Sequence, residues 1–201
     1  MVASKKRSIL DVILNEPPVP EEKTRPGVFI IESLGFRDEK KKRFEGQILR
    51  DMLTLSGREV EYWYVRTWKE LTEEIFQRFY DSKLRYLHLS CHGNSTHVCL
   101  TLDKVPFKEF GEEIRNYLPK RRLFVSACEV VNKSFSDAVN PGEECYSVIG
   151  PRDEIRFDDA AVMWASFYHL MLRDSKVMRS EQIRATLKRL KETFGQTFLY
   201  L

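Results

Sequence analysis

The chain has 201 residues, of which 42% are hydrophobic and 31% charged, a composition typical of one globular domain and not of a disordered chain. Its 33 basic and 30 acidic residues give a net charge of +3; they are spread along the sequence, which argues against a nucleic-acid partner. The apolar runs are too short to span a membrane, and no signal-peptide core is recognisable at the N-terminus. We therefore expect a cytoplasmic protein that has no membrane partner and keeps its four cysteines reduced.

The N-terminal residues 1–26 are predicted to form an arm or linker. A short amphipathic stretch, SKKRSILDVILN, leads into EPPVPEEKTRPG, whose four prolines stop regular structure. We expect residues 27–201 to form the single folded domain.

Strand and helix patterns alternate through this domain. Compact apolar or β-branched runs predict strands at residues 27–34, 58–65, 85–90, 122–127 and 145–150, with a short extra strand at 97–102. Apolar residues at helical spacing predict helices within residues 44–55, 68–79, 107–118, 158–172 and 183–194. Such alternation predicts an α/β fold with three layers, a mostly parallel sheet with helices on both faces.

Two of the predicted strands end in residues that can carry chemistry. One runs into Cys91-His92-Gly93 and the other into Cys128. Open parallel sheets place their reactive groups in the crevice beyond the carboxyl ends of the strands. A thiol with a nearby imidazole can form a thiolate nucleophile, and backbone N–H groups can stabilise an oxyanion. A buried structural cysteine beside an unrelated loop histidine is the alternative, because free cysteine is often buried.

The segments LHLSCHGNS and LFVSACE resemble the paired signatures of the CHAT family of caspase-like cysteine peptidases, which are relatives of caspases and separase. The matching order covers about residues 85–172, including a fifth strand and a helix containing Phe-Tyr. The resemblance implies a caspase-like three-layer sandwich over residues 27–201, a protein substrate and no cofactor. It makes His92 the general base and then acid, Cys128 the nucleophile, and the N–H groups of Gly93 and Cys128 the oxyanion donors.

The chain departs from the family pattern after the nucleophile. Glu129 matches the family's acidic residue and is expected to shape the loop, but Val130 and Val131 replace the usual Thr-Gly. The tryptophan often found before the family's acidic pair is also missing. These differences leave the substrate cleft and the loop around the nucleophile undetermined at the level of sequence.

Asp158 and Asp159 are candidate substrate-binding residues. In separase-like relatives, acids in this loop line the pocket for a basic P1 side chain, which implies cleavage after Arg or Lys. Both residues lie at the start of a predicted helix, where capping and the helix dipole would equally explain them.

Two other functional interpretations remain open. The chain could be a catalytically inactive caspase-like adaptor or regulatory module; an intermediate possibility is a latent peptidase activated by a separate regulatory or sensor protein. A zinc site formed by Cys91, His92, His97 and Cys99 has suitable ligand types but unusual spacing, so no metal is expected. His88 is interpreted as a packed strand histidine.

Overall fold

The computed structural model describes residues 24–201, so all but the last three residues of the predicted arm lie outside the described part. A six-stranded sheet runs through the centre in the order β2-β1-β3-β7-β8-β9. Its strands are β1 (Arg25–Glu32), β2 (Val60–Tyr64), β3 (Leu84–Ser90), β7 (Arg122–Ser126), β8 (Ser147–Pro151) and β9 (Phe198–Tyr200). Five of these strands run parallel, namely β2, β1, β3, β7 and β8. The sixth, β9, pairs antiparallel with β8.

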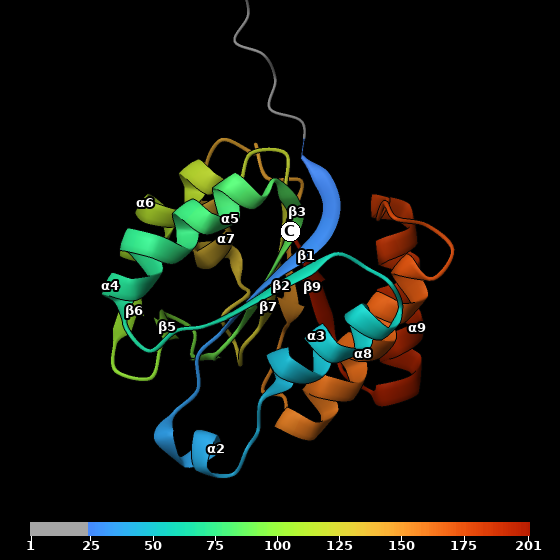
Figure 1. Ribbon diagram of the computed structural model, residues 1–201, viewed down its shortest axis with the longest axis horizontal. Helices are drawn as coiled ribbons and strands as arrows, with labels where there is room; N and C mark the ends of the chain where they lie inside the picture. Colours follow the sequence, from blue (N-terminus) through green and yellow to red (C-terminus); the bar gives the residue numbers. More distant parts are fainter. Residues whose placement is uncertain (1–23) are drawn as a thin grey trace, which may run out of the picture.

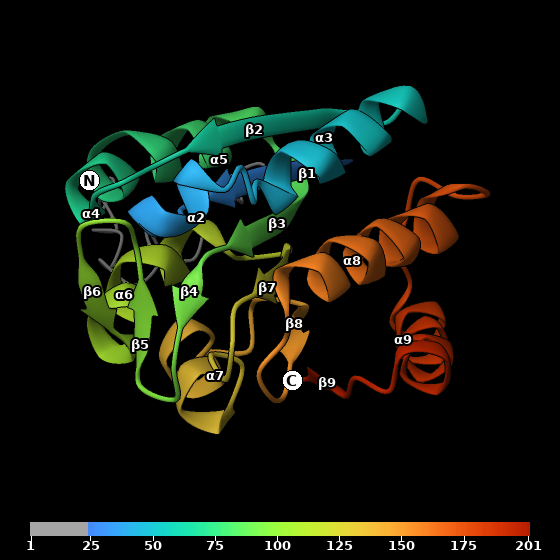
Figure 2. The ribbon, with the colours of Figure 1, turned by 90° about the horizontal axis from the view of Figure 1, so that it is seen from below.

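Helices cover both faces of the sheet (Figure 2). One layer contains α4 (Trp68–Glu70), a π-helical turn (Leu71–Ile75), α5 (Phe76–Ser82), α6 (Phe107–Ile114) and α7 (Lys133–Val139). The other contains α3 (Glu45–Leu55), α8 (Phe157–Leu172) and α9 (Ser180–Phe194). The α/β class, the mostly parallel sheet and the three layers predicted from the sequence are thus confirmed.

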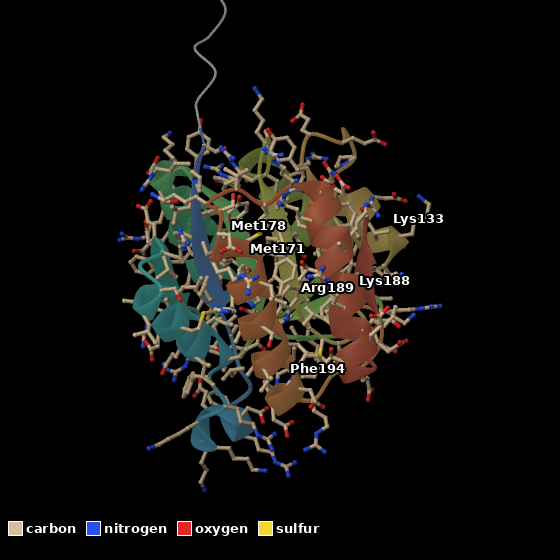
Figure 3. All side chains as sticks on the ribbon, turned by 90° about the vertical axis from the view of Figure 1, so that its right-hand side faces the viewer. Lys133, Met171, Met178, Lys188, Arg189 and Phe194 are labelled. Carbon is tan, nitrogen blue, oxygen red and sulfur yellow. The ribbon has the colours of Figure 1, made fainter. Side chains whose placement is uncertain are left out.

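The central strands are apolar on both sides because both of their faces are buried. In β1, Phe29 and Ile31 belong to one core and Val28 and Ile30 to the other. Neither face needs polar residues, which explains why this strand reads as a continuous apolar run. Figure 3 looks onto the second helical layer, in which α8 packs between α3 and α9.

Several short elements were not predicted. They are α2 (Phe36–Lys40), α7, β9 and the strands β4 (His92–Gly93) and β6 (Lys104–Pro106) that flank β5 (His97–Cys99) in a small antiparallel sheet. The position of α7 depends on its close approach to α6. Gly111 of α6 faces Ala138 of α7, and a Cβ at Gly111 would lie only 2.3 Å from the carbonyl oxygen of Ala138, so a larger residue would push the helices apart. Contacts of this kind stabilise elements too short to show a periodic pattern.

The predicted boundaries shift by a few residues. β1 begins at Arg25, before the expected start at Gly27, and β8 begins at Ser147 instead of Cys145. Within residues 24–201 no helix combines the length and apolar character needed to cross a membrane.

Candidate active site

His92 and Cys128 lie at the same level beyond two adjacent parallel strands. In the β3–β7 ladder, Ser90 is paired with Ser126, and each candidate residue follows its serine by two positions. The backbone N–H of Cys91 donates to the Ser126 carbonyl at 3.1 Å, which extends the contact past the strand ends. The strand register therefore brings the imidazole-bearing and thiol-bearing segments side by side.

The side chains of both residues face the chain from residue 152 to 157, the segment that leads out of β8 and ends at the first residue of α8. The Sγ of Cys128 is 3.7 Å from the carbonyl oxygen of Ile155. The imidazole of His92 packs edge-on against the ring of Phe157, with 5.4 Å between ring centroids. Ile155 and Phe157 are two residues apart, so the thiol and the imidazole contact the same short segment.

Cys128 differs from the other cysteines in its surroundings. Burial raises the pKa of the Cys91 thiol, raises that of Cys99, and raises that of Cys145 to about 11. Cys91 and Cys145 are buried, and a buried thiol is a poor nucleophile because its thiolate is disfavoured. Cys128 is half-buried and lies in a turn at the strand end, the setting in which a cysteine can meet a substrate.

Gly93 lies so close to Val130 that only a glycine fits at position 93. A Cβ at Gly93 would lie 2.1 Å from a methyl carbon of Val130 and 3.6 Å from the carbonyl oxygen of Cys128. The valine side chain is fully buried and occupies the space that a side chain at position 93 would need. The glycine thus joins the His-bearing strand closely to the Cys-bearing turn.

Val130 and Val131, which follow Glu129, both fill the core. Val131 is also fully buried, and a Cβ at Gly150 would lie 2.4 Å from one of its methyl carbons. These apolar side chains anchor the turn that follows Cys128 in the core.

The turn after Cys128 adopts an unusual backbone conformation. Glu129 has a φ of 56°, in the left-handed region that non-glycine residues seldom occupy. The side-chain amide of Asn132 donates to the carbonyls of Glu129 and Ser95, at 3.1 and 3.2 Å, and its oxygen caps α7 by accepting from the N–H of Phe135. Asn132, which was not predicted from the sequence, ties this turn to the β4–β5 turn.

A carboxylate that was not predicted from the sequence contacts His92. Asp38, on α2, has one oxygen 2.9 Å from the Nε2 of His92, and its other oxygen accepts from Arg43 at 2.9 Å. The Asp38 side chain is 12% exposed and the His92 side chain 42% exposed. The Arg43 guanidinium also lies over the Phe157 ring, 5.5 Å from its centroid. No sequence motif indicates this contact, because Asp38 lies 54 residues before His92.

Asp158 and Asp159 lie in the first turn of α8 and are exposed. The guanidinium of Arg156 donates to both oxygens of Asp158, at 3.1 and 2.9 Å, and is 3.8 Å from Asp159. The hydrogen bonds from Arg156 lower the pKa of Asp158. A basic side chain thus already occupies the predicted acidic pair.

A buried polar cluster lies beneath this edge of the sheet. His88 is fully buried, with Nδ1 3.0 Å from the Tyr168 hydroxyl and Nε2 3.3 Å from Glu45. The other oxygen of Glu45 accepts from Ser126 at 2.8 Å. The prediction that His88 is a packed strand residue is confirmed.

A large surface hollow lies away from the two candidate residues. It has a volume of about 490 Å³ and is lined by Thr96, Phe107 and Ala138 among others, and its lining includes neither His92 nor Cys128. In the described part of the chain, no group of three or more His, Cys, Asp or Glu residues is arranged to hold a metal ion.

The chain matches no protein-family model, and no curated protein matches it. The function must therefore be inferred from the geometry at this edge of the sheet.

Proposed function

We propose that the protein is a CHAT-type, caspase-like cysteine endopeptidase that hydrolyses protein substrates with His92 and Cys128. The observation that carries the proposal is the equal register of the two residues. Each lies two positions beyond paired serines of neighbouring parallel strands, and both face the segment before α8. This is the crevice in which open α/β sheets perform chemistry.

The reaction follows from the two groups. His92 takes the proton of the Cys128 thiol, and the thiolate attacks the carbonyl carbon of the scissile peptide bond. The oxyanion is stabilised by the N–H groups of Gly93 and Cys128, and the imidazolium returns its proton to the departing amine. Water activated by His92 then hydrolyses the thioester, which releases the carboxylic acid and regenerates the thiol.

The enzyme is proposed to be latent in the described conformation. The Ile155 carbonyl lies against the thiol and the Phe157 ring against the imidazole, so the segment before α8 occupies the space that a peptide must enter. Activation requires this segment to move, which suits control by a separate regulatory or sensor protein.

A basic P1 preference is part of the proposal. Asp158 and Asp159 follow the segment that covers the thiol, and they already bind one guanidinium, that of Arg156. A substrate arginine or lysine would compete with Arg156 for these carboxylates. Displacement of the segment and binding of a basic substrate residue would then be coupled.

The test uses a peptidyl acyloxymethyl ketone with arginine at P1, which alkylates an activated active-site thiol. Because the described conformation is latent, the test is made in the Phe157→Ala background, which removes the ring that covers His92. We expect labelling at Cys128 there, and roughly 10²-fold or greater slowing when His92→Ala is added, because a general base contributes that much. Tryptic mass spectrometry identifies the labelled cysteine. The matched probe with a neutral P1 residue should react more slowly, and Cys128→Ala should abolish cleavage of protein substrates in a lysate.

Cys99 is a second half-buried thiol in the same chain, so its labelling rate in the same background is the internal reference, and Cys99→Ala should leave the labelling of Cys128 unchanged. If Cys128 is labelled no faster than Cys99, or if His92→Ala does not slow its labelling, the peptidase is excluded. It would favour the alternative of a catalytically inactive caspase-like adaptor.

A further inference from the structure

The carboxylate of Asp38 has both of its oxygens engaged. One accepts from the Arg43 guanidinium at 2.9 Å, and the other is 2.9 Å from the Nε2 of His92. The Arg43 guanidinium has only donors, so it holds one oxygen of the Asp38 carboxylate as an acceptor. The second oxygen is thereby directed at the imidazole.

The backbone around Asp38 is fixed as well. The Arg43 N–H donates to the Asp38 carbonyl at 3.1 Å, and the Asp38 N–H donates to the Gly35 carbonyl at 2.9 Å. These bonds close the chain around α2 on both sides of the carboxylate. They limit the directions in which the Asp38 side chain can point.

The neighbouring residue anchors α2 to the sheet. Glu39 accepts two hydrogen bonds from Arg66, at 2.9 and 3.1 Å, and a third from the Tyr64 hydroxyl. These donors lower the pKa of Glu39, so it remains ionised and bound. The short helix that carries Asp38 is therefore held at two points, at His92 through Asp38 and at the end of β2 through Glu39.

We propose that Asp38 is the positioning residue for His92, and that the reaction proposed above is performed by a Cys128–His92–Asp38 arrangement. Asp38 contacts neither the substrate nor the thiol and acts through the imidazole. Its carboxylate accepts a hydrogen bond from Nε2–H, which leaves Nδ1 as the nitrogen that takes the proton of the thiol. When that proton arrives, the Nε2–H of the imidazolium stays paired with the carboxylate.

Arg43 makes this proposal sharply testable. In Asp38→Asn, the amide must present its oxygen to Arg43, because guanidinium cannot accept a hydrogen bond. The amide N–H₂ then faces His92 and requires a lone pair on Nε2. The imidazole proton is forced onto Nδ1, the wrong nitrogen for accepting the proton of the thiol.

Removing Arg43 should reverse the effect. In the double variant Asp38→Asn, Arg43→Met, the amide can rotate and present its oxygen to Nε2, which restores the original tautomer. Methionine retains an apolar side chain beside Phe157. The single variant Arg43→Met is the matched reference, because it lacks the guanidinium just as the double variant does but keeps the Asp38 carboxylate.

The experiment measures the His92 tautomer by ¹⁵N NMR of the full chain at pH 8, with His92→Gln to assign the signals. We expect Nε2–H in the wild type, Nδ1–H in Asp38→Asn, and Nε2–H again in the double variant. In the peptidase assay, Asp38→Asn should lower kcat roughly 10²-fold or more with KM little changed, and the double variant should recover much of that loss.

The tautomer measurement separates this inference from the proposed function on which it rests. An Nε2–H tautomer that persists in Asp38→Asn would overturn the positioning role, whether or not the protein cleaves peptides. A loss of kcat that Arg43→Met does not relieve would also overturn it, because it would indicate a structural role for Asp38. The expected tautomer pattern in a protein that never alkylates at Cys128 would instead leave Asp38 orienting His92 and remove the peptidase.

Discussion

The Glu32 carboxyl is fully buried near the end of β1. One oxygen accepts from the Gly46 N–H at 2.8 Å and the other from the Tyr62 hydroxyl at 2.8 Å. Burial outweighs these hydrogen bonds, and the nearby Glu45 adds repulsion, so the pKa of Glu32 is raised to about 7. Glu32, hydrogen-bonded to Gly46 and Tyr62, is thus a buried acid whose pKa lies near neutral pH.

Replacing Glu32 by glutamine should remove a pH dependence of stability. Because the folded-state pKa is above the value of 4.5 for an unperturbed Glu, the folded state binds the proton more tightly than the unfolded state. The free energy of unfolding should therefore fall as pH rises from about 4.5 to about 7, by up to roughly 3 kcal/mol. Urea unfolding at pH 5 and pH 8 measures it.

Glu32→Gln should unfold with nearly the wild-type free energy at pH 5 and a higher one at pH 8, since its amide resembles the protonated acid. Glu74→Gln on the exposed surface of α5's layer is the control, and it should keep the wild-type pH profile. Equal profiles for the wild type and Glu32→Gln would contradict the assignment of this titration to Glu32.

At the scale of elements, the segment between β8 and α8 decides access to the site. It contacts the thiol through Ile155 and the imidazole through Phe157, and Arg43 holds the Phe157 ring from the side of α2. Figure 1 shows α2 beyond the end of β1, in the lower part of the view, where α8 also begins. Two elements distant in sequence therefore meet over His92.

Phe157→Ala should open this segment and expose Cys128. The lost ring contacts are worth about 0.5–1.5 kcal/mol, so we expect iodoacetamide to alkylate Cys128 roughly 2- to 10-fold faster. The rate is measured by mass spectrometry of quenched samples, with circular dichroism to confirm folding.

Phe194→Ala is the matched control, because Phe194 lies at the end of α9 and is partly exposed (Figure 3). It should leave the alkylation rate unchanged. Slower alkylation in Phe157→Ala would show that the ring supports His92 and does not block the site.

At the scale of the whole molecule, the sheet separates two apolar cores. Phe110 belongs to the core under α5, α6 and α7, and Phe124 to the core under α3 and α8. Both side chains are fully buried. Since every strand of the six-stranded sheet contributes side chains to both cores, neither layer of helices can detach without exposing that sheet.

The two cores should therefore unfold together. Phe110→Ala and Phe124→Ala should each lower the free energy of unfolding by about 3–5 kcal/mol in a single transition. Circular dichroism and tryptophan fluorescence, followed in the same urea titration, test whether the transitions coincide. Leu55→Ala, at a side chain that is 90% exposed, should change stability by less than about 0.5 kcal/mol. Separate transitions for the two probes would contradict a single cooperative unit.

Much of the fold was predictable because strands with two buried faces and amphipathic helices leave long, regular patterns. The short elements were not predictable: α2, α7 and β9 have five, seven and three residues, too few for a period to show. Their conformation depends on neighbours such as Gly111, which lets α7 approach α6. Asp38 was missed for the same reason, since it lies on one of these short helices.

The sequence by itself determined the alternation of strands and helices, and it marked His92 and Cys128 as residues at strand ends, because local periodicity and composition are written along the chain. Tertiary structure alone decided that Asp38 meets His92, that Arg156 meets Asp158, and that Ile155 and Phe157 cover the thiol and imidazole. The physical reason is that such contacts depend on how loops from separate strands converge at one edge, and no local pattern encodes that convergence.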